Sequence, residues 1–220
     1  MSNGNRALPG EGMRRGAYAQ NYQPTFIDRF GVWLSARQIR RYIGSVGHKE
    51  LGDFGCGYHA AFVRTVLPEL ERAVLVDSAL ADDLKRHSKV TAIEGTLPDA
   101  LEQIPSVSLD IVLCISVLEH LWNPVTTLQE CFRTVRPGGF CVFNVPSWRG
   151  KRYLEYSAFR LGFSPREEMD DHKTYYDVKD FWPLLVRAGF LPSNIRCFSH
   201  KFGLNTFAIC LSHGGPKRQR

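Results

Sequence analysis

Short apolar runs alternate with segments of helical periodicity through the middle of the chain. Five apolar runs have the length and the β-rich composition of buried strands: 51–54, 73–76, 90–93, 109–115 and 140–145. Three segments between them have helical spacing: 60–67, 80–87 and 124–135. Pro124 stands where the last of these begins, and Pro137-Gly138-Gly139 prevents its continuation. This alternation predicts a parallel sheet with helices on both faces.

The flanking segments predict additions to that core. Residues 26–43 have apolar positions at helical spacing, and we expect one or two helices there that lean over the site. A helix at 178–188, ended by Gly189, should precede a terminal hairpin of 195–199 and 206–211. We therefore divide the chain into an N-terminal arm with lid helices, 1–45, and one domain, 46–220. The aromatic and charged segment 146–176 lacks clean periodicity and is interpreted as an inserted cap of that domain.

Composition fits one soluble domain. The 220 residues are 44% hydrophobic, enough for one substantial core but short for two. The first 20 residues lack the apolar region of a signal peptide, and no run approaches the roughly 18 apolar residues of a membrane span. Cysteine spacing lacks any C-x-x-C pair, which argues against a zinc site and favours thiols in a reducing compartment, the cytoplasm. The six cysteines are Cys56, Cys114, Cys131, Cys141, Cys197 and Cys210.

The net charge of +6 is concentrated toward the two ends of the chain. Such a surface attracts phosphates, acidic lipids or nucleic acid, so peripheral contact with a membrane is compatible with it. The sequence has no RNP-type aromatic motif and no Asn/Asp-Pro-Pro-aromatic motif after the fourth predicted strand. These absences disfavour nucleic acid as a partner, and no pattern predicts an oligomeric state.

A glycine-rich segment lies at the first strand-to-helix turn. Glycines at such a turn allow backbone amides to approach a ligand. Gly55, Gly57 and Ala60 satisfy the dinucleotide pattern G-x-G-x-x-A, and Asp77 ends the next strand, where a carboxylate can hold a ribose hydroxyl. The loop by itself therefore fits both a nicotinamide enzyme and a methyltransferase.

Four ordered motifs distinguish these two possibilities. They are Asp53 with the glycine loop, Asp77, Ser116-Val117-Leu118-Glu119-His120 after the fourth strand, and Arg136-Pro137-Gly138-Gly139 before the fifth. Together they resemble the class I S-adenosylmethionine-dependent methyltransferases, in particular the branch that methylates small molecules, lipids and sugars. The resemblance covers about residues 51–145. It implies an α/β, Rossmann-like, seven-stranded and mostly parallel sheet with an antiparallel last strand.

The resemblance also implies a cofactor site for S-adenosylmethionine, with S-adenosylhomocysteine as the product. Asp53, Gly55, Cys56 and Gly57 would surround the methionine moiety, and Asp77 would bind both ribose hydroxyls. The remaining implied contacts are Ser78 beside the ribose, Thr96 and Leu97 at the adenine, and Ile115 and Ser116 along the methionine and the transferred methyl. His59 departs from the family, which usually has glycine there.

Methyl transfer from a sulfonium requires mainly alignment of the acceptor and exclusion of water. If the acceptor is a hydroxyl, a histidine is the expected proton acceptor. His120 follows Glu119 after the fourth strand, and His172 lies in the predicted cap beside Asp170 and Asp171. We take His172, His120 and Glu119 as the catalytic candidates. A structural role for the Glu-His pair and a charged surface loop around His172 are the competing interpretations.

Other features could serve the acceptor. Arg149, Lys151 and Arg152 follow the fifth strand and could hold a phosphate or carboxylate, while Tyr18, Trp148 and Tyr153 could grip an apolar group. The acidic residues at 167, 168, 170 and 171 lack regular ligand spacing, so we predict no metal.

The leading hypothesis is an S-adenosylmethionine-dependent O-methyltransferase acting on a small metabolite, a sugar or a lipid-linked glycan. N-methylation is nearly as compatible with the residues. The alternatives are an NAD(P)-dependent oxidoreductase, although no Tyr-x-x-x-Lys pair follows the sheet core, and a non-catalytic S-adenosylmethionine-binding protein.

Overall fold

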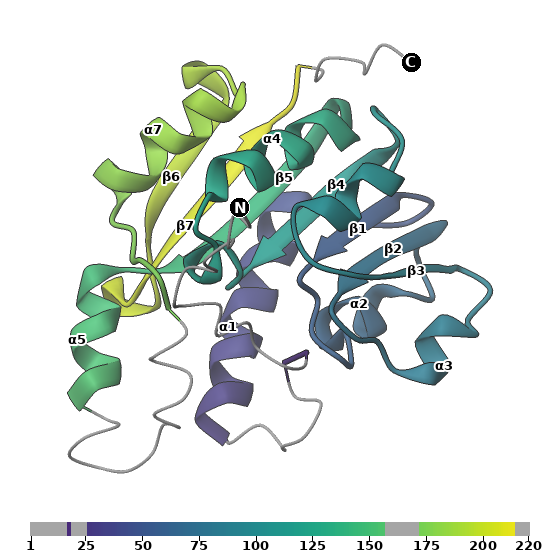
Figure 1. Cartoon of the computed structure of the whole chain (residues 1–220), viewed down its shortest axis with the longest axis horizontal. Helices are drawn as coiled ribbons and strands as arrows, with labels where there is room; N and C mark the ends of the chain where they lie inside the picture. Colours follow the sequence, from purple (N-terminus) through teal and green to yellow (C-terminus); the bar gives the residue numbers. More distant parts are fainter. Residues whose placement is uncertain (1–16, 19–25, 157–171, 214–220) are drawn as a thin grey trace, which may run out of the picture.

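The computed structural model describes residues 17–18, 26–156 and 172–213, which form a seven-stranded sheet between layers of helices (Figure 1). The strands are β1 Glu50–Phe54, β2 Arg72–Asp77, β3 Val90–Glu94, β4 Leu109–Ile115, β5 Val135–Pro146, β6 Ile195–His200 and β7 Asn205–Leu211. The α-helices are α1 Phe26–Ile43, α2 Ala61–Val66, α3 Asp82–Lys85, α4 Pro124–Thr134, α5 Trp148–Tyr156 and α7 Val178–Ala188. Short 3₁₀ helices are η1 Asp99–Gln103, η2 Leu118–His120, η4 Pro192–Asn194 and η5 Lys201–Gly203.

The strand order is β3-β2-β1-β4-β5-β7-β6. Strands β1 to β5 pair in parallel, whereas β7 is inserted antiparallel between β5 and β6. The predicted fold class is therefore confirmed, including the antiparallel last strand. This order reverses direction between β1 and β4, and in open α/β sheets ligands bind outside the carboxyl ends of strands at such a switch point.

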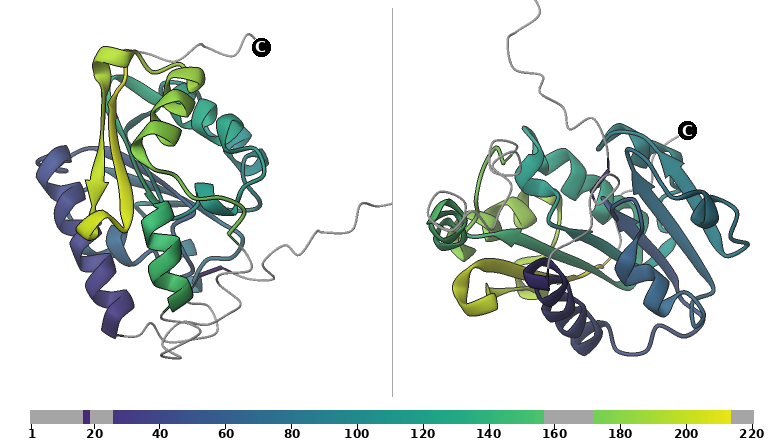
Figure 2. Two further views of the ribbon diagram at one scale, coloured as in Figure 1. Left: turned by 90° about the vertical axis from the view of Figure 1, so that its left-hand side faces the viewer. Right: turned by 90° about the horizontal axis from the view of Figure 1, so that it is seen from below.

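Helices cover both faces of the sheet, as the views from the side and from below show (Figure 2). One core lies under α1, α2 and α3 and includes Ile39, Val63 and Leu84. The other lies under α4, α7 and η1 and includes Leu128 and Phe181. Because each face of β1, β4 and β5 is buried, these strands read as nearly continuous apolar runs in the sequence.

Two boundaries differ from the prediction. The predicted helix 80–87 is helical only at Asp82–Lys85. Strand β5 begins at Val135, five residues before the predicted start, because Val135 already pairs with Leu109 before the register shifts. Gly138 adopts a φ of 79°, which lets the chain bend there without ending the strand.

The predicted cap 146–176 lies partly outside the described residues. Its first part is α5, which continues directly from β5 and extends with α1 below the sheet in Figure 1. Among the described residues, no helix is both long enough and apolar enough to cross a bilayer.

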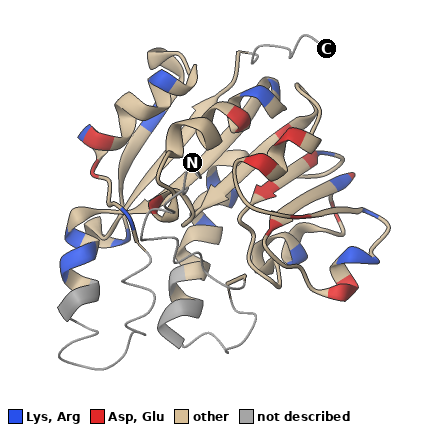
Figure 3. Cartoon of the chain, viewed as in Figure 1, with Lys and Arg blue, Asp and Glu red and all other residues tan. Residues whose placement is uncertain are grey.

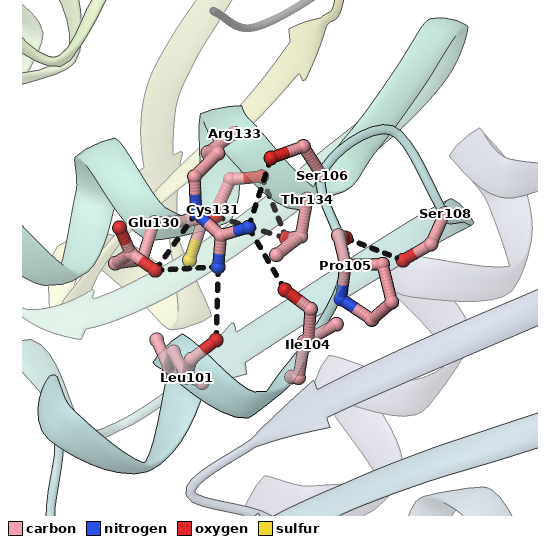
Figure 4. A network of polar contacts seen from close by, with 9 residues as sticks. All are labelled: Leu101, Ile104, Pro105, Ser106, Ser108, Glu130, Cys131, Arg133 and Thr134. Carbon is pink, nitrogen blue, oxygen red and sulfur yellow. Dashed lines mark hydrogen bonds and ion pairs between the residues drawn. The ribbon is translucent and has the colours of Figure 1, made fainter. Parts of the chain in front are cut away.

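A buried arginine ties the helix layer to the loop after β3 (Figure 4). Arg133 of α4 is 5% exposed and forms an ion pair with Glu130 at 2.6 Å. Its guanidinium also donates to the carbonyls of Leu101 and Ile104 and to the hydroxyl of Ser106. These bonds fix η1 against α4.

Candidate active site

The glycine loop is held by backbone bonds to the end of β2. The amides of Gly55 and Cys56 donate to the carbonyl of Val76, at 2.7 and 3.3 Å. Gly55 has a φ of 79°, and a Cβ on it would collide with the side chain of Val117. The loop therefore needs glycine at this position and packs directly on the segment that follows β4.

Two carboxylates meet beside this loop. Asp77 accepts hydrogen bonds from the amides of Gly57 and Ser78, at 2.8 and 2.7 Å, and from the Ser78 hydroxyl at 3.1 Å. Asp53 is only 6% exposed, and among the described residues it has no cation partner. Burial, followed by the charge of Asp77, raises the pKa of Asp53 from 3.8 to about 7. This pair suits a ligand that brings both a cation and hydroxyl groups.

These bonds distinguish the two cofactors that the loop motif left open. A dinucleotide places its pyrophosphate against free amides at the start of the helix. Here the amides of Gly55, Cys56 and Gly57 are already bonded within the protein, and the nearest charges are the carboxylates of Asp53 and Asp77. S-adenosylmethionine carries an ammonium, a sulfonium and ribose hydroxyls, so the residues present fit it and disfavour a pyrophosphate.

The remaining residues predicted around the cofactor all follow strands at the same edge of the sheet. Ser78 and Thr96 are exposed after β2 and β3, and Leu97 is half-buried. Ile115 ends β4, and Ser116 follows it with a φ of 56°, a left-handed conformation that is uncommon outside glycine. Such a conformation turns the chain sharply at the edge where ligands bind in this type of sheet.

Residues 17 and 18, the part of the first 25 residues that the structure describes, lie against the glycine loop. The carbonyl of Tyr18 accepts from the amide of Tyr58 at 2.9 Å, and Ala17 is buried. The His59 side chain, which departs from the family pattern, is exposed and makes an edge contact with the Tyr58 ring. His59 therefore points outward, and the loop keeps its glycine-based geometry.

The three predicted catalytic residues lie together. One ligand atom from each of Glu119, His120 and His172 falls within 4.8 Å of the other two. The rings of His120 and His172 make an edge contact with centroids 4.7 Å apart. Glu119 is 2% exposed, while both histidines are half-buried. Val117, two residues before Glu119, lies against Gly55, so the segment that carries Glu119 and His120 is next to the glycine loop.

Sequence reasoning assigned no role to several neighbours of this cluster. Tyr175 is buried, and its hydroxyl lies 3.1 Å from Nδ1 of His172. Burial, and then the charge of Glu119, raises the pKa of Tyr176 to about 12. Burial lowers the pKa of Lys201 to about 8, against the opposite effect of Glu119. Lys201 belongs to the turn between β6 and β7, where no sequence signal pointed to the site.

The aromatic, basic and acidic residues that the sequence singled out for the acceptor or a metal lie in different parts of the chain. Trp148 and Tyr153 are about half exposed on α5, where Arg149, Lys151 and Arg152 also lie. Figure 3 colours part of this helix blue, for Lys and Arg. The acidic residues at 167, 168, 170 and 171 lie outside the described part of the chain. All six cysteines are free thiols, four of them buried.

Comparison with known proteins agrees with this geometry. A family model described as a methyltransferase domain matches residues 52–143. A probable S-adenosylmethionine-dependent methyltransferase of Mycolicibacterium smegmatis is 25% identical over 190 residues, covering 83% of this chain and 68% of the relative. The ubiquinone biosynthesis O-methyltransferase of Paracidovorax citrulli is 30% identical over 126 residues, covering 52% of each protein. This chain thus spans about half to two thirds of these relatives.

A solved S-adenosylmethionine-dependent methyltransferase from Archaeoglobus fulgidus has the same fold. It superposes with a TM-score of 0.58 at 15% identity and covers 84% of this chain and 99% of its own. The sheet order, the glycine loop with its two carboxylates, and the matched domain together identify a class I S-adenosylmethionine-dependent methyltransferase domain. Its cofactor is S-adenosylmethionine, and S-adenosylhomocysteine is the product.

Proposed function

We propose that this chain transfers a methyl group from S-adenosylmethionine to an oxygen atom of a small, sugar or lipid-linked acceptor. The observation that carries the proposal is the cluster of Glu119, His120 and His172 beside the glycine loop. It offers polar groups that can hold a hydroxyl and promote loss of its proton. Relatives named as O-methyltransferases support oxygen as the acceptor atom.

The chain's own residues would divide the work of binding the cofactor. Bound S-adenosylmethionine supplies an electrophilic methyl on a sulfonium. Asp53 would pair with its positive methionine end, beside Gly55, Cys56 and Gly57, while Asp77 and Ser78 would hold the ribose. The adenine would lie against Thr96 and Leu97, and Ile115 with Ser116 would line the path of the methyl. We also assign residues 1–45 as an arm and lid, which the contact between Tyr18 and Tyr58 supports.

The first test is calorimetric titration of the full chain with S-adenosylhomocysteine, NADH and NADPH in separate experiments. We expect micromolar binding of the first ligand alone. Labelled S-adenosylmethionine with a panel of phenols, sugars and lipid-linked glycans then tests transfer. Binding of a nicotinamide cofactor would refute the assignment, and binding of S-adenosylhomocysteine without transfer to any acceptor would favour the non-catalytic alternative.

Asp77→Ala should weaken binding of S-adenosylhomocysteine by roughly 1–3 kcal/mol, because the ribose hydroxyls lose their shared acceptor. Calorimetry measures this change directly. Ser78→Ala removes only a side-chain hydroxyl from the same carboxylate and serves as the matched control, with a smaller effect expected. Wild-type affinity in Asp77→Ala would show that the ribose binds elsewhere.

A series of aromatic contacts runs from His172, in the cluster with Glu119 and His120, to the surface. The His172 ring contacts Tyr175, with centroids 5.4 Å apart, and Tyr175 contacts Trp148 at 5.6 Å. The Lys151 ammonium lies 5.9 Å from the centroids of both Tyr175 and Trp148. Beside this path, the hydroxyl of Ser147 donates to the carbonyl of Gly203, which places η5 next to α5. Such a surface suits an apolar acceptor that carries a negative group.

Phe202 in η5 is 85% exposed and adjoins the basic helix α5, an arrangement that favours acceptors presented at an acidic membrane. Phe202→Ala should therefore weaken co-sedimentation with vesicles of acidic phospholipid by about tenfold or more, since burying a phenyl group is worth roughly 1.5–3 kcal/mol. Leu191→Ala, at an exposed residue distant from α5, is the control. Equal sedimentation of both variants would argue for a small soluble acceptor. The free cysteines fit a reducing compartment such as the cytoplasm.

A further inference from the structure

We propose that Glu119, His120 and His172 together bind a divalent transition-metal cation of the zinc class at the acceptor side of the site. This inference deepens the proposed function, on which it rests, because the cation would hold the oxygen that receives the methyl group. The sequence predicted no metal, because only the six cysteines and the acidic residues near 170 were considered as ligands. These three residues form a different set, in which the second histidine is 52 positions from the first.

The donor geometry comes close to a metal site. All three ligand atoms lie within 4.8 Å of one another. Ligand atoms around a tetrahedral zinc ion are separated by about 3.4 Å, given metal–ligand bonds of about 2.0–2.2 Å. Small rotations of the side chains would close this difference. A half-buried pair of imidazoles with a buried carboxylate also leaves one or more positions of the ion open.

Backbone bonds hold the two ligand segments in register. The amides of Lys173 and Thr174 donate to the carbonyl of Glu119, at 2.7 and 3.3 Å. The residue after His172 is therefore fixed to the residue before His120. Ligands that are positioned before the ion binds lose little conformational freedom on binding.

A second layer of contacts orients one histidine. The hydroxyl of Tyr175 lies 3.1 Å from Nδ1 of His172. Metal-bound histidines almost always engage their second ring nitrogen in such a bond, which fixes the ring and leaves Nε2 as the ligand. Two imidazoles and one carboxylate suit Zn²⁺, Co²⁺ or Fe²⁺, whereas Mg²⁺ and Ca²⁺ prefer sites made wholly of oxygen.

The chemistry expected of this ion is that of a Lewis acid. A hydroxyl that coordinates the ion releases its proton to water more readily. The resulting oxygen forms a bond to the methyl carbon as the carbon–sulfur bond breaks, and the electron pair of that bond stays on sulfur. One proton, one methylated acceptor and S-adenosylhomocysteine result, so no oxidant or reductant is required.

A metal-free arrangement is the competing explanation. Glu119 interacts electrostatically with Lys201, and a carboxylate shared between this ammonium and the histidines would bring the same side chains together. The two explanations differ in whether a cation binds to the wild-type chain and whether its binding depends on all three residues.

The experiment is titration of the chelator-treated full chain with Zn²⁺ by calorimetry and with Co²⁺ by visible absorption. We expect one equivalent of either ion to bind with micromolar affinity or better. Glu119→Gln and His172→Ala should each weaken binding at least about 100-fold, because even second-layer partners are typically worth 10–100-fold. Tyr175→Phe should weaken it about tenfold, and His87→Ala, at an exposed histidine away from the site, should leave it unchanged.

Each variant is also titrated with S-adenosylhomocysteine, and retained cofactor affinity shows that it is folded. Absence of micromolar metal binding in the wild type, or equal binding in Glu119→Gln and wild type, would overturn the metal site. Wild-type protein that binds S-adenosylhomocysteine but no metal would leave the proposed methyl transfer standing. Failure to bind S-adenosylhomocysteine would instead contradict the proposed function itself.

Discussion

Replacing Asp53 with asparagine should stabilise the cofactor-free protein at pH 8 and at the same time weaken its binding of S-adenosylhomocysteine. Asp53 is buried beside Asp77, and its pKa is raised from 3.8 to about 7. Between about pH 4 and pH 7, Asp53 therefore holds a proton in the folded state that it has lost in the unfolded state. The stability contributed by this group is fully present below pH 4 and disappears as the pH rises to 7.

At pH 8 the carboxylate is charged in both states, and its burial opposes folding by up to about 4 kcal/mol. Asparagine removes this cost. Urea unfolding of wild type and Asp53→Asn at pH 4 and pH 8 isolates the contribution, because other titrating groups are common to both proteins. The advantage of the variant should be small at pH 4 and large at pH 8.

The cofactor supplies the cation that the apo site lacks. Loss of the charge at Asp53 should weaken S-adenosylhomocysteine binding by about 1.5–3 kcal/mol, the usual value of a hydrogen bond to a charged group. Asp82→Asn removes a carboxylate that is 73% exposed and should alter neither property. A variant that gains stability yet binds the cofactor normally would place the positive methionine end away from Asp53.

The sequence predicted the fold well because its signals are local or periodic. Buried parallel strands must be continuously apolar, and Pro124 with Gly189 marks real helix ends. The start of β5 was not predictable, since Val135 completes the predicted helix yet pairs with Leu109. Pro137 and the glycines suggested a break, whereas the sheet accommodates them as an irregularity in the register.

The cofactor side of the site could also be predicted from the sequence, because each of its residues lies in or shortly after the last residues of a strand. Contacts between segments distant in the sequence could not be predicted in this way. Nothing in the sequence indicated that His120 and His172 would meet, or that Lys201 would lie near Glu119. The proximity of the two histidines depends on the backbone bonds that Lys173 and Thr174 donate to Glu119, which join two distant segments of the chain. The raised pKa of Asp53 likewise depends on burial and on the distance to Asp77.

Arg133→Met should lower the free energy of unfolding by about 3–5 kcal/mol, the range expected when one partner of a buried ion pair is removed. Methionine replaces much of the volume but removes the ion pair of Arg133 with Glu130, whose side chain is 15% exposed. It also leaves the carbonyls of Leu101 and Ile104 without this donor. Urea unfolding measures the loss.

Arg64→Met is the matched control, because the pair of Arg64 with Asp83 is 37% and 60% exposed and such pairs are worth at most about 1 kcal/mol. Arg133→Met combined with Glu130→Met should recover part of the loss, since both charges of the pair are then removed. Because η1 follows Thr96 and Leu97, loosening it should also weaken S-adenosylhomocysteine binding. A loss of stability in Arg133→Met without any loss of cofactor affinity would show that η1 does not position the adenine side of the site.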